Sequence, residues 1–179
     1  AQGLANPIAG AVLIGLSVGV GYMVFGNLFL IFIVLTRYLL RLKNFEKAGD
    51  FYALSAVRTA AYNYLLNLSR HVFLNVVRGT PFIVWFYRAL GAKIGRNTFI
   101  LSTRLYDLDM LEIGNDCVIG GNVAINAHTV EGSRGVMHGV KIGNRVSIGA
   151  DTMILPGVVM EDGVTIGACS LIPKHSHLE

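Results

Sequence analysis

An aliphatic residue recurs at every sixth position through the C-terminal half of this chain. The uninterrupted series is Ile142, Ile148, Ile154, Met160, Ile166 and Ile172. Two positions before the next aliphatic residue stands a small or β-branched one: Val146, Thr152, Val158, Val164 and Ser170. Neither an α-helix nor an alternating strand has a period of six residues. A chain coiled as a triangular prism, with six residues on each face, needs this pattern, so the sequence predicts a hexapeptide parallel β-helix.

The same period is present earlier in the chain. It includes Ile94 and Ile100, and then Ile113, Ile119 and Ile125. We therefore expect the β-helix domain at residues 91–174, with about four to five coils and a tail at residues 175–179. Between Ile125 and Ile142 the period breaks, and residues 126–139 are rich in polar groups and glycine. Regular coils form walls, so this excursion is the expected functional segment.

The N-terminal segment has a different composition. Residues 1–36 contain no Asp, Glu, Lys, Arg or His, and residues 7–35 are almost wholly apolar. That length suffices to cross a bilayer, so residues 1–48 are expected to form a transmembrane helix with a basic flank. A cleaved secretory signal would carry a basic start and a shorter apolar stretch. The first residue is Ala rather than Met, which fits a piece of a longer, polytopic protein.

Basic residues gather after this apolar segment. Residues 37–93 contain nine Lys and Arg against two acidic residues, whereas residues 94–179 contain six against nine, and the whole chain carries a formal charge of +4. Basic flanks favour the cytoplasmic side, so the β-helix is predicted to lie there. Anionic membrane lipids are the expected partner. Nucleic acid is not, because the basic residues form no recognition helix and the repeat domain is acidic.

Residues 49–90 are predicted to form an interfacial helical collar. One amphipathic, basic helix is expected over residues 50–78. A second, aromatic helix should begin after Thr80, with Pro81 in its first turn, and stop at Gly91. It is expected either to face the membrane or to plug the open end of the β-helix. Cys117 and Cys169 fall within the repeats and are expected to be buried free thiols, with neither disulfide nor metal-ligand spacing.

His128 is the predicted catalytic residue. It follows Asn126 at the end of a repeat face, where rigid backbone would fix its position. A histidine there can act as general base, removing a proton from a hydroxyl or amine as it attacks a thioester. The alternative is a histidine that only hydrogen-bonds the loop to the wall. For His138, just before the period resumes, the structural role is favoured.

The repeats resemble the hexapeptide-repeat acyltransferases, which include the maltose and galactoside acetyltransferases. The similar segments are Ile142-Gly-Asn-Arg-Val-Ser-Ile-Gly-Ala and Ile166-Gly-Ala-Cys-Ser-Leu-Ile-Pro-Lys174. The resemblance implies a left-handed β-helix, a homotrimer, acetyl-CoA as donor, and His128 as the catalytic histidine. It also implies a basic residue near the coenzyme phosphates at Lys174 and small turns along the pantetheine arm at Gly149, Ala150, Gly167 and Ala168.

A second resemblance extends over the whole chain. The similar segments are Leu90-Gly-Ala-Lys-Ile-Gly-Arg96, Tyr106-Asp-Leu-Asp-Met-Leu-Glu-Ile-Gly114 and His128-Thr-Val-Glu-Gly-Ser-Arg134. They look like the C-terminal region of polytopic nonribosomal-peptide-synthetase-like proteins of the polylysine-synthetase type. This implies other transmembrane or synthetase domains as partners and an aminoacyl thioester on a carrier arm as an alternative donor. Asp107 and Asp109 then become candidates for orienting His128 or an amine acceptor, or else are solvated acids on an outer corner.

Two other functions remain open. The γ-type carbonic anhydrases share the fold, and Met137-His138-Gly-Val-Lys-Ile-Gly143 fits part of their zinc pattern, but Ser133 stands where one zinc ligand is required. No metal is therefore expected. The other alternative is a platform for assembly and docking in a membrane synthetase. The favoured prediction is a membrane-associated acyltransferase whose acceptor is linked to lipid or delivered by a membrane-embedded neighbour.

Overall fold

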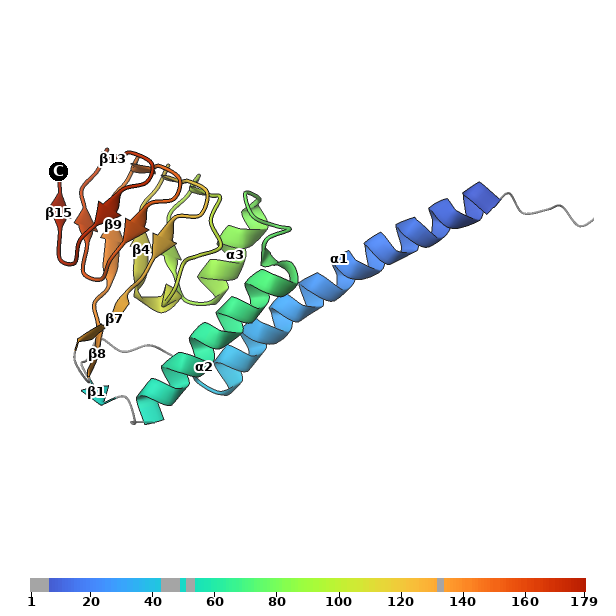
Figure 1. Ribbon diagram of the computed structural model, residues 1–179, viewed down its shortest axis with the longest axis horizontal. Coiled ribbons are helices and arrows are strands. Elements are labelled where there is room, and N and C mark those ends of the chain that lie inside the picture. The colour runs from blue at the N-terminus through green and yellow to red at the C-terminus, as the bar shows by residue number, and fades with distance from the viewer. Residues whose placement is uncertain (1–6, 43–48, 51–53, 132–133) are drawn as a thin grey trace, which may run out of the picture.

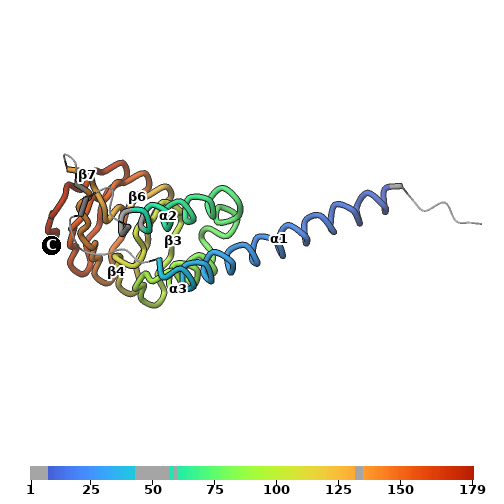
Figure 2. Tube along the Cα trace, turned by 90° about the horizontal axis from the view of Figure 1, so that it is seen from below, coloured from blue at the N-terminus to red at the C-terminus, as the bar shows by residue number. Residues whose placement is uncertain are grey.

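A computed structural model describes residues 7–42, 49–50, 54–131 and 134–179 of the chain. Its C-terminal part is a stack of short strands, and a layer of helices covers one end of the stack (Figure 1). From this layer α1 (Pro7–Leu39) projects far beyond the rest of the molecule. Figure 2 shows the same arrangement from below, with the stack of coils at one end and the single helix at the other.

The stack consists of parallel strands on three faces. The first face contains β2 (Lys93–Ile94), β4 (Leu111–Ile113), β9 (Val140–Ile142), β12 (Val159–Met160) and β15 (His177–Leu178). The second contains β3 (Phe99–Ile100), β5 (Val118–Ile119), β10 (Ser147–Ile148) and β13 (Thr165–Ile166). The third contains β6 (Ala124–Ile125), β11 (Met153–Ile154) and β14 (Leu171–Ile172). Successive strands visit successive faces, which confirms the predicted parallel β-helix. β15 pairs with β12, so strand pairing continues into the segment expected to be a tail.

The six-residue period places its aliphatic side chains inside the prism. Ile119 pairs in register with Ile148, and Ile148 with Ile166, so like residues stack from coil to coil. Ile119, Ile125, Ile148 and Ile154 are all buried, as are the smaller residues between them, among which are Val123, Val146, Thr152 and Val158. Burying one such isoleucine contributes about 1.5–3 kcal/mol relative to leaving it exposed. The interior is therefore filled by the two sets of residues that define the repeat.

The corners of the prism explain the small residues that follow the aliphatic ones. A Cβ added to Gly114 would lie 2.5 Å from the carbonyl oxygen of Gly143 in the next coil, so only glycine permits this stacking distance. Cys117 is buried as expected, but Cys169 is exposed. The prediction for Cys169 is wrong because this residue occupies a corner with φ of 57°, where its side chain points away from the core.

One helix in the described part of the chain, over Ile8–Leu39, is long and apolar enough to cross a membrane. Every residue from 8 to 25 is exposed, and at 1.5 Å per residue this stretch is about 27 Å long. The later turns pack against the molecule: Gly26 lies against the ring of Phe73, and Ile33 is buried. The N-terminal part of α1 is thus an exposed apolar helix, and contacts from Tyr22 onward anchor its C-terminal part.

The predicted helix at 50–78 is shorter in the structure. It consists of α2 (Leu54–Ser69), which continues as the π-helix η1 (Arg70–Leu74). Tyr62, Leu66 and Phe73 are completely or almost completely buried, and this face packs against α1. The helix therefore belongs to the core of the helical layer and does not simply lie on a surface. Two of the basic residues expected near lipid, Arg37 and Arg70, are also buried.

The aromatic helix α3 (Pro81–Ala89) begins after Thr80 and ends before Gly91, as predicted. Thr80 has extended backbone, but its hydroxyl donates to the carbonyl oxygen of Val77 and not to the helix N-terminus as a cap would require. The buried side of α3 includes Tyr87, whose hydroxyl donates to the carbonyl oxygen of Ser102. α3 therefore covers the open end of the β-helix, which was one of the two predicted roles of the aromatic helix.

Candidate active site

Two excursions leave the β-helix at the same corner, between its third and first faces. The first follows Leu105, which forms a parallel bridge with Ile125, and contains the 3₁₀ turn η2 (Leu108–Met110). The second is the hairpin of β7 (His128–Glu131) and β8 (Arg134–Met137), which occupies the predicted break in the period. β8 also pairs with β1 (Gly49–Asp50). Since Leu105 and Ile125 are stacked, the two excursions begin side by side.

This stacking brings Asp107 and His128 together. Oδ2 of Asp107 lies 2.5 Å from Nδ1 of His128 and accepts a hydrogen bond of 3.3 Å from the backbone N–H of Ala127. Asp107 is completely buried and adopts a left-handed backbone conformation, with φ of 51°. The side chain of His128 is 42% exposed. The pair therefore has a buried carboxylate and an imidazole that reaches solvent.

The contact with Asp107 defines what His128 can do. The hydrogen bond that Nδ1 of His128 donates to this carboxylate raises the pKa of His128, and partial burial acts in the opposite direction. Because an ionised carboxylate only accepts hydrogen bonds, a neutral His128 carries its proton on Nδ1. Its Nε2 then has a free lone pair, and in the described part of the chain Nε2 has no hydrogen-bond partner. The arrangement is that of a general base held by a carboxylate.

Asn63 and Arg70 of the helical layer and Tyr106 of the first excursion lie around this pair, and no role for any of the three was predicted from the sequence. The side-chain amide of Asn63 donates to Oδ1 of Asp107 at 2.8 Å. The ring of Tyr106 is perpendicular to the His128 ring, with centroids 6.4 Å apart. Arg70 lies over the Tyr106 ring and donates to its hydroxyl at 2.9 Å. The available signal was weak: Asn63 and Arg70 share one helix face with the exposed Asn67, and such a polar stripe is typical of a solvated surface.

Asp109 lies elsewhere. Its Oδ2 is 3.8 Å from Nη2 of Arg37 in the last turns of α1, and its side chain is 5% exposed. The expectation that Asp107 and Asp109 are solvated acids on an outer corner is therefore wrong, because the helical layer covers both. Glycine at position 91 makes room for this pair, since an added Cβ would lie 2.5 Å from the Arg37 guanidinium.

The other residues predicted for this corner are near the hairpin. Asn126 is half-buried two positions before His128, and its backbone N–H donates to the carbonyl oxygen of Ile154. Lys174 lies in the last corner of the same edge, and its Nζ is 2.5 Å from Oε1 of Glu131 in β7. The hairpin is thus tied to the last coil by an ion pair in which both side chains are partly exposed.

The small residues predicted to line the pantetheine arm occupy a different corner. Gly149 and Ala150 follow β10, and Gly167 and Ala168 follow β13, so both turns lie between the second and third faces. They are stacked, as shown by the hydrogen bond from the N–H of Cys169 to the carbonyl oxygen of Ala150. Within one chain, the predicted residues therefore form two groups on the two edges of the third face.

His138 is separate from the pair. Its ring is exposed and lies 4.6 Å from that of His175, centroid to centroid. Ser133, which stands where a carbonic anhydrase needs a ligand, is outside the described residues. In the residues that the structure does describe, no group of three or more His, Cys, Asp or Glu side chains is placed to hold a metal ion.

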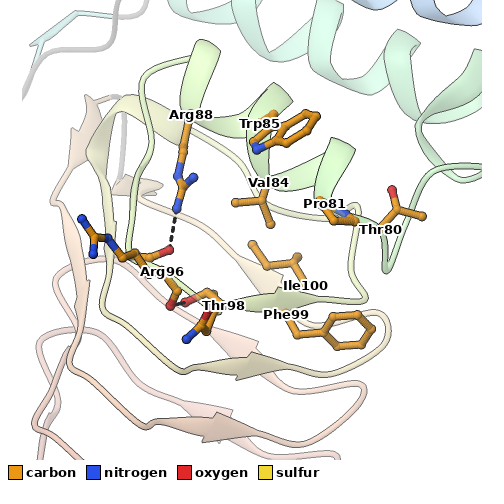
Figure 3. A pocket seen from close by; sticks show the side chains of 11 residues that line it. Thr80, Pro81, Val84, Trp85, Arg88, Arg96, Thr98, Phe99 and Ile100 are labelled. Carbon is orange, nitrogen blue, oxygen red and sulfur yellow. Dashed lines mark hydrogen bonds between the residues drawn. The ribbon is translucent and has the colours of Figure 1, made fainter.

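A shallow groove of about 480 Å³ lies between α3 and the first coil (Figure 3). Trp85 and Arg88 come from the helix, and Arg96 and Phe99 from the coil. Arg88 donates to the carbonyl oxygens of Ile94 and Gly95, which fixes its guanidinium at the groove. The groove is thus basic and aromatic, and it does not include Asp107 or His128.

Comparison with known proteins identifies the family. Residues 136–174 match the family described as bacterial transferase hexapeptide (six repeats). The candidate acetyltransferase YvoF of Bacillus subtilis (strain 168) is 33% identical over 118 residues, which cover 62% of this chain and 69% of YvoF. The chain belongs to the hexapeptide-repeat acyltransferase family, whose fold is the left-handed parallel β-helix.

Other similarities differ in how much of each chain they cover. The delta-poly-L-ornithine synthetase of Acinetobacter baumannii (strain AB307-0294) is 34% identical over 94 residues, which are 52% of this chain but only 7% of the synthetase. The structure of a galactoside acetyltransferase in complex with coenzyme A superimposes on this chain with a TM-score of 0.50 and 17% sequence identity. The match covers 75% of this chain and 82% of the acetyltransferase chain, and it supports the fold. A maltose O-acetyltransferase from Clostridium difficile 630 has a TM-score of 0.44 and 19% sequence identity. This match covers 75% of this chain and 88% of the maltose O-acetyltransferase chain.

Proposed function

We propose that this protein is a membrane-associated acyltransferase in which His128 is the general base. It transfers an acyl group from a phosphopantetheine thioester to a hydroxyl or an amine. The observation that carries the proposal is the pair of Asp107 and His128, whose atoms Oδ2 and Nδ1 are 2.5 Å apart while the ring reaches solvent. A buried carboxylate that holds a half-exposed imidazole in one tautomer is suited to removing a proton from a bound acceptor.

The reaction needs only one base. As the acceptor oxygen or nitrogen attacks the thioester carbonyl carbon, its proton passes to Nε2 of His128. The new bond forms, the tetrahedral intermediate collapses, and the carbon–sulfur bond breaks. The proton then passes from Nε2 to the leaving sulfur, which restores the neutral imidazole. Throughout, the carboxylate of Asp107 stabilises the positive charge that develops on the ring.

The donor is proposed to be acetyl-CoA or a carrier-bound aminoacyl thioester. The first is supported by the family and by the galactoside acetyltransferase solved with coenzyme A, and the second by the match to the polyornithine synthetase. Both donors carry a phosphopantetheine arm, and the small turns at Gly149 and Gly167 are the proposed contacts along it. Lys174 is the proposed phosphate contact. Its ion pair with Glu131 must then open or be shared when the donor binds.

A homotrimer would join the two groups of predicted residues. His128 and Lys174 lie on one edge of the third face and the small turns on the other, so donor and base meet if one subunit faces the next. The outward side of the third face supports such packing, because Leu171 and Met153 are exposed there to 62% and 38%. Mass measurement of the detergent-solubilised chain tests this, and a monomer that transfers acyl groups would contradict it.

The membrane is the proposed location. The exposed apolar stretch of α1 is about as long as the hydrocarbon core is thick. The basic residues that follow it favour the cytoplasmic side for the β-helix. The groove between α3 and the first coil adds aromatic and basic side chains of the kind found at headgroup level. Because these features hold the site near a bilayer, the proposed acceptor is linked to lipid or delivered by a membrane-embedded neighbour.

The proposal is tested by comparing His128→Ala with His138→Ala in the full chain. Loss of a general base usually costs a hundred- to ten-thousandfold in rate, so we expect that loss in His128→Ala. His138→Ala is the matched control, since this exposed histidine touches neither Asp107 nor His128 in the described structure. The opposite ranking of the two variants would refute the assignment of the base.

A platform for assembly is the second candidate. It is favoured by the match to 7% of a long synthetase, since a small region of such a protein can serve to position other domains. This function predicts that the chain assembles with its neighbours but turns over no thioester. The platform function would be supported if the wild type transfers no acyl group and if both the wild type and His128→Ala still assemble with their neighbours.

A further inference from the structure

Asn63 occupies a position that helix formation does not explain. It lies in the middle of α2, where asparagine is less favourable than most residues because its side chain competes for backbone hydrogen bonds. Its neighbours Tyr62 and Leu66 are buried in the helical layer, whereas Asn63 itself is half-buried. Its side chain reaches out of this apolar surface to a residue 44 positions later in the chain.

The contact has two points. Nδ2 of Asn63 donates to Oδ1 of Asp107 at 2.8 Å, and Oδ1 of Asn63 accepts from the backbone N–H of Asp107 at 3.4 Å. The other carboxylate oxygen, Oδ2, faces His128 and the N–H of Ala127. Asn63 therefore acts on the carboxylate from the side opposite to the histidine. A carboxylate held at both oxygens cannot rotate away from Nδ1 of His128 without losing hydrogen bonds on both sides.

The helical layer makes a second contact with the turn that contains Asp107. Asp109, two residues after Asp107, is paired with Arg37 near the end of α1. α2 thus contacts the acid that orients the base, and α1 contacts the neighbouring acid. The hairpin that leaves the β-helix supplies His128, but the position of its partner Asp107 depends on helices that precede the repeats.

We infer that Asn63 is a positioning residue of the active site, and that helix α2 completes the pair of Asp107 and His128. This inference rests on the proposed function of His128 and extends it to a part of the chain outside the repeats. It follows that the β-helix separated from its helices has an incomplete site. Asn63 touches neither reacting atom, so its effect on rate acts through Asp107.

The test uses Asn63→Leu in the full chain. Leucine has a similar size and is the better helix former, so the variant keeps the packing but loses the hydrogen bonds to Asp107. A misplacement of about 1 Å at a catalytic group can cost on the order of a hundredfold, and we expect kcat to fall on that scale with KM little changed. The control is Tyr64→Leu, at the next residue along α2, which is 68% exposed and for which we expect wild-type kinetics.

The pH dependence separates positioning from a purely structural role. Besides Asp107, the titratable and charged groups beside the His128 ring in the described ranges of the chain are Tyr106 and, behind it, Arg70. The Asp107 hydrogen bond raises the pKa of His128, so a loosened Asp107 must lower this pKa. We therefore expect the acid limb of the pH–rate profile to move to lower pH in Asn63→Leu and to stay unchanged in Tyr64→Leu.

Each outcome decides one question. A folded Asn63→Leu protein with wild-type kcat and pH profile overturns the inference, even if its melting temperature is lower. An unfolded Asn63→Leu protein overturns it also, because Asn63 would then be needed for packing. If instead His128→Ala keeps full activity, the proposed function itself fails, whatever Asn63→Leu does. The inference is supported only when His128→Ala is inactive and Asn63→Leu shows both the loss in kcat and the shifted acid limb.

Discussion

Replacing Asp107 by Asn removes the charge of the carboxylate and keeps its shape. Asparagine tolerates the left-handed backbone of this position, where φ is 51°. Its Oδ1 can still accept from Nδ1 of His128, and its new amino group then faces Asn63. Rotating the Asn63 amide turns an oxygen toward that amino group, so the shorter hydrogen bond between the two side chains can be preserved, and only the longer one from the backbone N–H of residue 107 is lost. We therefore expect Asp107→Asn to fold, with its main effect on catalysis.

The size of the effect follows from the hydrogen bonds. A bond to a charged group contributes about 1.5–3 kcal/mol net and a neutral one about 0.5–1.5 kcal/mol, so losing the charge costs about 1–1.5 kcal/mol. The lower end applies because the His128 side chain is 42% exposed and solvent screens the contact. Since about 1.4 kcal/mol corresponds to a factor of ten in rate, a loss of about 1 kcal/mol means that kcat/KM should fall about fivefold at alkaline pH.

The assay is the pH dependence of kcat/KM for acyl transfer. The base must be neutral, so the wild-type rate rises with pH through the pKa of His128, which the Asp107 hydrogen bond raises. Asp107→Asn lowers this pKa, so its acid limb must move to lower pH and its deficit must shrink at acid pH. Asp109→Asn is the control: it weakens the pair with Arg37 and should reduce stability without moving the limb. An acid limb that stays in place in Asp107→Asn would refute the role of Asp107.

Two further predictions concern the fold and the membrane. In Gly120→Ala the new Cβ would lie 2.7 Å from the backbone nitrogen of Ala150, whereas Gly121→Ala meets nothing within 4 Å. Thermal unfolding should show the first destabilised by roughly 1–3 kcal/mol and the second within about 1 kcal/mol of the wild type, and equal melting temperatures would contradict the stacking. Val18→Arg, at the middle of the exposed stretch of α1, should weaken retention in alkaline-washed membranes, because an arginine at the centre of a bilayer costs about 2.5–3.5 kcal/mol. Val57→Arg, at an exposed position on α2, should leave retention unchanged.

The β-helix was predictable because its signal is local. Ile148, for example, can be assigned to the interior from the aliphatic residues six positions before and after it, and its burial confirms that assignment. The start of α3 was equally local, since Pro81 and the residue before it define the first turn. The break after Ile125 likewise located the hairpin that begins at His128.

The contacts of the candidate site were harder to predict because they join distant segments. That Asp107 lies against His128 depends on the stacking of Leu105 on Ile125, which no periodicity specifies. The contact with Asn63 requires in addition the docking of α2, so a single sequence contains almost no sign of it. The burial of Arg37 was missed for the same reason: its charge suggested lipid, but its partner is Asp109.

The central claim is that this chain moves an acyl group with His128 as base. The most direct measurement supplies the full chain, in its membrane, with isotope-labelled acetyl-CoA or a labelled aminoacyl carrier thioester, and follows both thioester loss and the labelled product by mass spectrometry. The account predicts that the wild type transfers label to a membrane-bound acceptor and that His128→Ala transfers at least about a hundredfold more slowly. Equal transfer by the two proteins, or label that reaches no acceptor from either donor, would contradict it.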